Sequence, residues 1–366
     1  MGTHRARALA AVLLTAAFAT AAEEPAGRFS SVSEAQRLAL LRRAQVWRRT
    51  DVPSMDLRAG PPGGFAPGQD VTCDYVVPEK KLTGSTRKFE CALAPGDVVK
   101  VKYGDDNGEV YATVAASRLF WGLGFGTDAF YQVRLTCRSC PRDPWNAPEP
   151  RLPTVVFEHA TIERKTPGEE IAHKEGEGWG WDELARVDPA QGGAPAEQIQ
   201  ALTLLAVFVQ HTDNKAIQQR FLCLRGGENK EDDDSCATPF LVQHDLGATF
   251  GRGGLIGAPT TGSANFREWS SVRYWESPES CRTHLGGNIT RHTLKDPVIS
   301  EAGRRFLAGL LAQLTDAQIR GMFEAARIDG RQWHEAEDAL RNGTVDQWVA
   351  AFKAHRDEIT QHTCPR

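Results

Sequence analysis

The sequence has no excess of positive charge. Its 366 residues include 43 Lys and Arg against 47 Asp and Glu, which gives a formal net charge of −4. Proteins that bind nucleic acid through its phosphates carry clustered positive charge, so this balance argues against a nucleic acid partner. With 41% hydrophobic and 25% charged side chains, the composition is that of an ordinary globular protein.

Long apolar runs are also missing after the start of the chain. Residues 8–21 form one uninterrupted run of apolar and small side chains, shorter than the ~20 residues that a helix needs to cross a bilayer. Arg5 and Arg7 precede this run, and residues 19–21 have the small-x-small pattern of a signal peptidase site. We therefore expect residues 1–21 to be a secretory signal, with an uncleaved membrane anchor as the alternative.

Removal of this segment has consequences for the rest of the chain. It takes away two arginines, lowers the formal net charge from −4 to −6 and leaves a body of about 345 residues, or two domain units. We expect this body to be secreted or periplasmic and to contain no transmembrane segment. Its oligomeric state does not follow from the sequence.

Cysteine spacing typical of zinc sites is absent as well. Cys137 and Cys140 form a single Cys-x-x-Cys sequence, without a second pair or paired histidines at ligand spacing. In an exported protein the eight cysteines instead indicate disulfide bonds. Cys137 and Cys140 either pair with each other, belong to two separate bridges, or form a redox pair, although no thioredoxin-like βαβ pattern surrounds them. The sequence predicts that Cys73–Cys91 and Cys223–Cys236 each bridge a hairpin, and that Cys281–Cys364 joins the C-terminus to the rest of the protein.

Strand patterns dominate the first half of the chain and helix patterns the second. Short β-type runs bounded by turn signals occupy residues 71–77, 87–93, 98–103, 131–136 and 154–161. Helical patterns cover residues 34–49, 108–123, 194–210, 300–314, 316–326 and 345–360. This segregation predicts an α+β fold with two lobes. After the signal, residues 22–153 would form an N-terminal helix and a β-rich lobe, and residues 154–366 a mainly helical lobe.

Two acidic residues are predicted to meet at one end of a two-stranded ribbon. An apolar helix runs into a polar segment with Asp213, Lys215 and Gln218, and a strand follows. The returning strand ends in the sequence Asp245-Leu246-Gly247. Phosphoryl transfer needs a metal ion that bridges the phosphates and a carboxylate aimed at the attacking hydroxyl. The two segments therefore have the residue types of a phosphotransferase site.

This pair of motifs resembles the atypical kinases, the group that contains the phosphoinositide lipid kinases, the HipA-like kinases and the secretory-pathway protein kinases. Their Asp-x-(His/Lys)-x-x-Asn catalytic loop is matched by Asp213, Lys215 and Gln218, and their metal motif by Asp245-Leu246-Gly247. The resemblance implies a two-lobed protein-kinase-like fold that transfers a phosphoryl group from ATP with Mg²⁺ or Mn²⁺. It further implies that Asp213 and Lys215 are catalytic and that Asp245 and Gln218 are metal ligands.

Matching parts occur in the same order in the first half, so the resemblance covers roughly residues 71–251. Lys102, at the end of a strand, resembles the lysine that contacts the nucleotide phosphates, and Glu109 resembles the helix carboxylate that holds this lysine. A segment of small residues resembles the phosphate loop of the HipA-like group, whose backbone N–H groups cradle phosphate oxygens. This segment contains Gly84, Ser85, Thr86 and Lys88.

Several of these residues also have simpler interpretations. Asp245-Leu246-Gly247 is an ordinary turn sequence after a strand, and Gly84 fits an ordinary hairpin turn. Lys102 can lie on the solvated face of an edge strand. We assign no catalytic role to His211 and His244, which lie close to the two aspartates in the sequence.

Three functions therefore stay open. Gln218 stands where the family has asparagine, and although its carbonyl can still ligate a hard cation, the change favours a catalytically inactive kinase-fold binding module. Cys137 and Cys140 allow a third interpretation, an exported thiol oxidoreductase. For an active kinase, the acceptor can be a protein, glycan or lipid hydroxyl, because the motifs do not describe the acceptor site.

Overall fold

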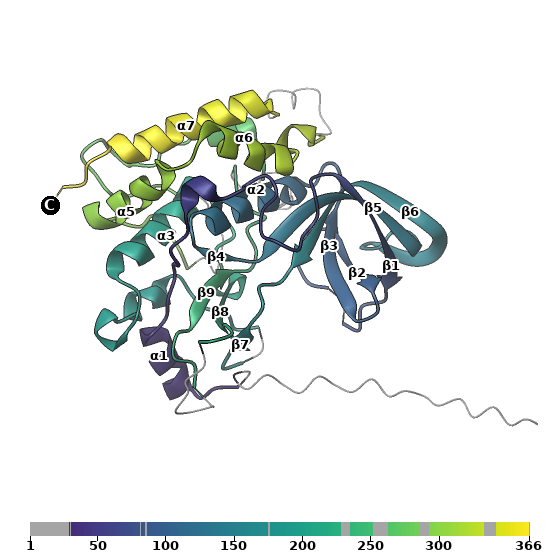
Figure 1. Ribbon diagram of the computed structural model, residues 1–366, viewed down its shortest axis with the longest axis horizontal. Coiled ribbons are helices and arrows are strands. Elements are labelled where there is room, and N and C mark those ends of the chain that lie inside the picture. Colours follow the sequence, from purple (N-terminus) through teal and green to yellow (C-terminus); the bar gives the residue numbers. More distant parts are fainter. Residues whose placement is uncertain are drawn as a thin grey trace, which may run out of the picture.

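The computed structural model describes most of the chain after residue 28. Strands dominate residues 69–171 and helices dominate residues 196–361, which is the α+β composition that the sequence predicts (Figure 1). The expected signal at residues 1–21 lies outside the described residues. The described residues are 29, 31–80, 82–84, 86–174, 176–227, 235–251, 263–285, 293–332 and 342–365.

Five strands close into a barrel. In hydrogen-bonding order they are β1 (Gln69–Val76), β2 (Lys88–Ala94), β3 (Asp97–Tyr103), β6 (Ala147–Arg164) and β5 (Ala129–Asp143). β1 and β5 are parallel, and the other neighbours are antiparallel. Val99 and Val101 of β3 lie in the barrel core. Because side chains alternate along a strand, Lys100 and Lys102 point out of the barrel.

A second, four-stranded sheet contains one strand that precedes β5 and three strands that follow β6. Its strands, in order, are β4 (Gly126–Thr127), β9 (Phe240–Gln243), β8 (Gln219–Cys223) and β7 (Glu169–Ile171). β8 and β9 are antiparallel and buried along their whole length. Helix α2 (Gly108–Gly122) follows β3 and contacts both β5 and helix α6 (Asp316–Ala325), so it connects the barrel with the helical part.

The helices of the second half pack around aromatic side chains. Trp269 and Trp348 stack with their ring centroids 5.3 Å apart. Thr315 and Gln318 form the predicted reciprocal cap at the start of α6. Among the described residues, no helix is both long and apolar enough to span a bilayer. The remaining α-helices are α1 (Glu34–Arg42), α3 (Ala196–Phe208), α4 (Phe266–Ser270), α5 (Glu301–Leu311) and α7 (Val345–Gln361). The 3-10 helices are η1 (Val52–Ser54), η2 (Asp182–Arg186), η3 (Pro189–Gln191), η4 (Ala216–Gln218) and η5 (Ile328–Gly330).

Two predicted boundaries differ from the structure. The first helix ends at Arg42 instead of continuing to residue 49, because Gln45 and Trp47 form β-bridges with Phe240 and Phe125. The expected boundary between residues 153 and 154 falls inside β6, which pairs with β5 on both sides of that point. The strand-rich part therefore extends to the end of β6.

All eight cysteines form disulfides. The three predicted pairs are confirmed, and Cys137 pairs with Cys140 within β5. Of the alternatives for the Cys-x-x-Cys sequence, the structure therefore has the local bridge. Both of its sulfur-bearing residues are buried in the barrel core, beside Cys73 and Cys91.

Candidate active site

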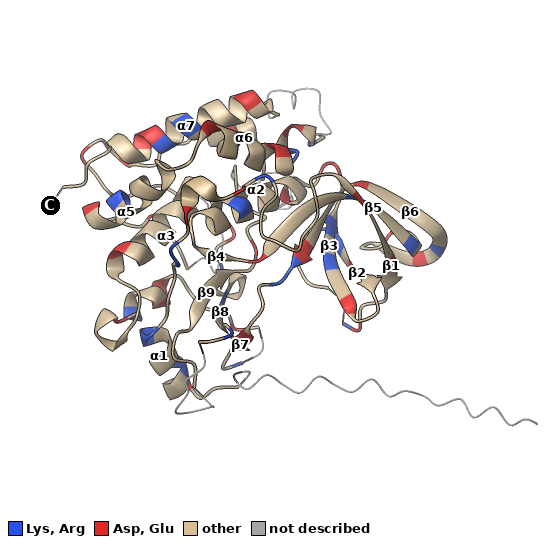
Figure 2. Cartoon of the chain, in the orientation of Figure 1, with Lys and Arg blue, Asp and Glu red and all other residues tan. Residues whose placement is uncertain are grey.

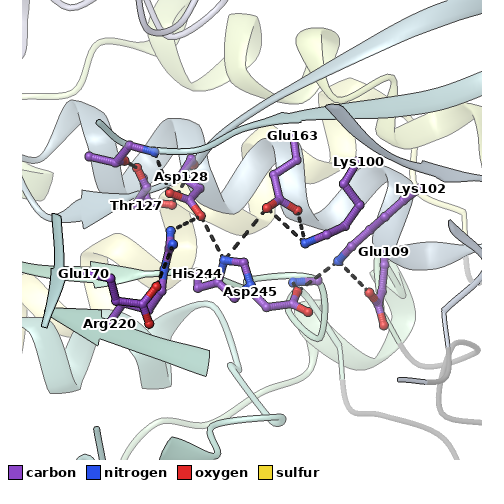
Figure 3. A network of polar contacts seen from close by, with 12 residues as sticks. Lys100, Lys102, Glu109, Thr127, Asp128, Glu163, Glu170, Arg220, His244 and Asp245 are labelled. Carbon is purple, nitrogen blue, oxygen red and sulfur yellow. Dashed lines mark hydrogen bonds and ion pairs between the residues drawn. The ribbon is translucent and has the colours of Figure 1, made fainter. Parts of the chain in front are cut away.

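The centre of the candidate site is an ion-paired lysine. Charged residues of both signs are spread over the helices and strands (Figure 2), but Lys102 is only 4% exposed. Its Nζ lies 2.8 Å from Glu109 Oε2 and 3.0 Å from Asp245 Oδ1 (Figure 3). The predicted lysine, helix glutamate and metal-motif aspartate are thus brought together. The alternative in which Lys102 lies on a solvated edge is wrong, because β3 is paired on both sides and the side chain is buried.

Local structure explains how Lys102 reaches a glutamate only seven residues away. β3 ends at Tyr103, a tight turn follows, and α2 begins at Gly108. Asn107 caps this helix, its side chain accepting a hydrogen bond from the backbone N–H of Glu109. Glu109 therefore lies in the first helical turn, directly beside the end of the strand. The short spacing reflects a short connection between β3 and α2.

The charges in this cluster stabilise one another. Burial by itself would lower the pKa of Lys102, but the carboxylates of Asp245 and Glu109 outweigh burial and raise this pKa above its usual value. Burial likewise works against the ionised form of Asp245, yet the Lys102 charge and a hydrogen bond from the Gly247 N–H lower the pKa of Asp245. The side chain of Asp245 is 30% exposed, so a ligand can reach it.

A second lysine lies next to this cluster. Lys88 is the cross-strand partner of Lys102, and its Nζ lies so close to the Gly84 turn that a Cβ atom at Gly84 would be 2.9 Å away. Burial and the positive charge of Lys102 lower the pKa of Lys88. The ammonium group of Lys88 thus lies against the turn that the sequence predicts as a phosphate loop, and Lys102 is its neighbour on the next strand. Thr86 in this turn is buried, and Ser85 lies outside the described residues.

Asp213, Lys215 and Gln218 form a second polar cluster. Lys215 Nζ lies 2.6 Å from Asp213 Oδ1, and Gln218 Nε2 donates a hydrogen bond to Asp213 Oδ2 over 3.1 Å. Asn214 lies between them in sequence but is buried, and its side chain binds the backbone of His211 and Leu294. The residue pattern did not predict this anchor. The one feature of the sequence that pointed to Asn214 was its position between the charged residues Asp213 and Lys215.

The segment that contains Asp213 and the segment that contains Asp245 are hydrogen-bonded to each other. Directly before Asp213, the Thr212 N–H donates to Ala248 O over 3.0 Å. At the other end of the loop, the His244 N–H donates to Gln218 O over 2.8 Å. The predicted catalytic loop and metal motif therefore lie side by side, as the hairpin formed by β8 and β9 requires.

A second lysine–glutamate pair, which the residue pattern did not predict, joins β3 and β6. Lys100 Nζ lies 3.0 and 2.8 Å from the two carboxylate oxygens of Glu163. Lys100 and Glu163 are cross-strand partners in the pairing of β3 with β6, and Lys102 pairs with Thr161 in the same register. The signal for this pair was the spacing of Lys100 and Lys102, which places both side chains on the same face of β3.

Comparisons with known proteins identify no family for this chain. No family model matches it, and no curated protein matches it. Among solved structures, a kinase is similar in part of its backbone. It is the proinflammatory kinase CtkA from Helicobacter pylori, which matches with a TM-score of 0.41 and 11% sequence identity over 81% of this chain and 95% of that chain.

Proposed function

We propose that the protein is an exported, two-lobed atypical kinase that transfers a phosphoryl group from ATP to a hydroxyl acceptor. The single observation that carries this proposal is the contact of one buried lysine with both Glu109 and Asp245. Protein kinases use a strand lysine paired with a helix glutamate, together with a nearby aspartate that binds Mg²⁺, to orient nucleotide phosphates. Four disulfides support a location outside the cytoplasm.

The residues present fit a magnesium ion. Mg²⁺ binds oxygen ligands, and one or two carboxylates together with phosphate oxygens are its usual partners. Asp245 supplies a partly exposed carboxylate with a lowered pKa, and Gln218 supplies an amide on the adjoining loop. Bound Mg²⁺ or Mn²⁺ would bridge phosphate oxygens and offset their charge. The metal role of both residues is part of the proposal.

Nucleotide phosphates would bind where the lysines are concentrated. Lys102 and Lys88 point to the same side of the barrel, and Lys88 has a lowered pKa because it is buried next to another ammonium group. A phosphate placed between them would remove this repulsion and form charge-assisted hydrogen bonds. The turn with Gly84, Ser85 and Thr86 would cover these phosphates with its backbone N–H groups.

Asp213 would act on the acceptor. Its carboxylate would accept the proton of the attacking hydroxyl while the new oxygen–phosphorus bond forms and the bond to the leaving diphosphate breaks. Lys215, 2.6 Å from Asp213, would stabilise negative charge on the transferred group. Protein, glycan and lipid hydroxyls are all compatible with this chemistry.

Binding and turnover measurements test the proposal. We expect wild-type protein to bind ATP in a magnesium-dependent way in calorimetry, and Asp245→Asn to lose the magnesium dependence. Asp213→Asn should keep binding and lose phosphoryl transfer by about 100-fold or more, the usual contribution of a general base. Asp97→Asn is the matched control, because Asp97 pairs with Arg164 and contacts neither loop. Absence of ATP binding by the wild type would refute the proposal.

A catalytically inactive binding module is the second candidate, and one contact favours it. The Gln218 amide donates to Asp213, which occupies a carboxylate oxygen that a catalytic base needs free. Magnesium-dependent ATP binding without any turnover would support this candidate. The third interpretation, a thiol oxidoreductase, has less support, since Cys137 and Cys140 are buried and thiol exchange needs an accessible sulfur.

A further inference from the structure

Asp128 lies where the chain passes between the four-stranded sheet and the barrel. It is the only residue between β4 and β5, and its backbone N–H donates to Gln243 O in β9. The chain leaves the barrel again at the end of β6, where the Thr166 N–H donates to Asp128 Oδ1 over 2.7 Å. Thr166 Oγ1 in turn donates to Thr127 O over 2.8 Å. Asp128 therefore holds together the two connections that join β5 and β6 to the second sheet.

The other oxygen of Asp128 binds one residue of β8 and the residue that precedes Asp245. Arg220 Nη2 lies 2.6 Å and His244 Nδ1 2.9 Å from Asp128 Oδ2 (Figure 3). Arg220 belongs to β8, which continues directly from the catalytic loop, and His244 directly precedes Asp245. The Asp128 side chain is 0% exposed, and the contacts with His244 and Arg220 outweigh its burial and lower its pKa. Each donor comes from a different segment of the chain.

We propose that Asp128 is a positioning residue that fixes Asp245 at the separation from Lys102 that metal and nucleotide binding require. This inference rests on the proposed kinase function. The Lys102–Asp245 contact joins the barrel to the loop after β9, so it forms only when barrel and sheet keep one relative position. Asp128 contacts His244, the residue next to Asp245, and it also joins the two chain connections that enter and leave the barrel. His244 also lies 3.9 Å from Glu163 of β6, which extends the connection to the barrel wall.

A metal site is the alternative for this cluster. Asp128, Glu163 and His244 offer ligand atoms that all lie within 4.8 Å of one another. However, Arg220 already neutralises Asp128, and Lys100 binds both oxygens of Glu163. A divalent cation at this point would have to displace or repel two positive side chains. The cluster is therefore better explained as a network of ion pairs that sets geometry.

Magnesium dependence separates positioning from general stabilisation. Replacing a residue that hydrogen-bonds a metal ligand changes metal affinity by 10- to 100-fold, and Asp128 acts one residue further out, through His244. For Asp128→Asn we expect the Mg²⁺ concentration that gives half-maximal ATP binding to rise about tenfold, while ATP binding in EDTA stays within about twofold of wild type. His244→Phe, which removes the Nδ1 donor but leaves Arg220 and Thr166 on Asp128, should raise the Mg²⁺ requirement in the same direction. Asp97→Asn, which breaks a different carboxylate–arginine pair, should leave it unchanged.

The outcomes distinguish this inference from the proposed function. If wild-type protein binds no ATP with Mg²⁺, the kinase proposal fails, and the positioning role fails with it. If the wild type binds and Asp128→Asn has the same Mg²⁺ requirement, only the positioning role is overturned. Equal weakening of ATP binding with and without Mg²⁺ would also overturn it, because a general loss of structure has that effect. Should Asp128→Asn fail to fold, His244→Phe decides the question by the same criterion.

Discussion

The two polar clusters of the candidate site differ in how they are held. Lys102 is buried and contacts two carboxylates, whereas Asp213 and Lys215 form a single pair with side chains 31% and 34% exposed. Exposed ion pairs contribute little to stability, whereas breaking a buried pair leaves an uncompensated charge. The barrel side of the site is therefore rigid and preassembled. The pair of Asp213 and Lys215 can rearrange at little cost.

Removal of the central lysine should show the largest effect. Lys102→Met leaves Glu109 and Asp245 without their shared cation, and we expect it to lower the free energy of unfolding by about 3–5 kcal/mol. ATP binding should be lost as well. Urea unfolding and calorimetry measure the two effects.

The matched control for this experiment is Lys215→Met, which removes a cation from the exposed cluster. It should lower the free energy of unfolding by no more than about 1 kcal/mol. Similar losses of stability in both variants would contradict the difference between a rigid barrel side and an adjustable catalytic loop.

Asp245 in the site and His355 in the helical core should lose their contributions to stability in different pH ranges. The lowered pKa of Asp245 keeps its pair with Lys102 ionised in the folded protein, so the stability it provides is lost as pH falls from the ordinary aspartate value of 3.8 down to that lowered pKa. His355 behaves differently, because burial lowers its pKa to about 4 from an unperturbed value of 6.5. The unfolded chain therefore binds the proton first, and stability falls as pH decreases from about 6.5 to about 4.

Replacement of His355 measures this contribution. Wild-type protein should lose about 3 kcal/mol more stability than His355→Phe between pH 7 and pH 4. Urea unfolding across this pH range gives the difference. Phenylalanine retains the ring contacts with Phe208 and Trp269, while the lost hydrogen bond to Trp269 O adds a cost that does not depend on pH. If the free energy of unfolding falls equally with pH in the two proteins, His355 is not the group that causes the loss of stability.

Lys88 should affect binding more than stability. Because its ammonium group is half-buried beside Lys102, Lys88→Met removes a repulsion and should leave the free energy of unfolding within about 0.5 kcal/mol of wild type. ATP affinity should fall about tenfold, or about 1.4 kcal/mol, through the loss of one charged phosphate contact. Lys353→Met, which breaks an exposed pair with Asp316, is the control. A loss of stability without a loss of ATP affinity would remove Lys88 from the phosphate site.

Patterns confined to a short stretch of sequence predicted the structure well. The two hairpin disulfides and the reciprocal cap of Thr315 and Gln318 all depend on nearby residues. Alternation along β3 likewise explains why Lys102 points away from the barrel core. Such features follow from local spacing, which a single sequence contains.

Features that depend on distant segments could not be predicted. Residues 43–49 have a helical pattern, yet Gln45 pairs with Phe240, almost two hundred residues away. Asp128 had no signal at all, since its partners Thr166, Arg220 and His244 are 38, 92 and 116 residues away in sequence. The parallel pairing of β1 with β5 that closes the barrel is of the same kind. Each is decided by tertiary packing, not by residue pattern.

Gln218 should give the smallest change in stability and the sharpest test of the exposed cluster. Its amide donates one hydrogen bond to a partly exposed carboxylate, so Gln218→Asn should change the free energy of unfolding by less than about 1 kcal/mol. The shorter side chain should withdraw the donor from Asp213 and free this carboxylate to accept the hydroxyl proton. Magnesium-dependent turnover of ATP should then rise about tenfold, a modest part of what a general base contributes.

The control for Gln218→Asn is Gln313→Asn, the same chemical change at an exposed position whose side chain donates to Gly309 O. It should leave both stability and turnover unchanged. If Gln218→Asn binds ATP with Mg²⁺ and still shows no turnover, the occupied carboxylate is not what limits catalysis. The adjustable side of the site would then lack a working base, and the inactive binding module would be the better description of the protein.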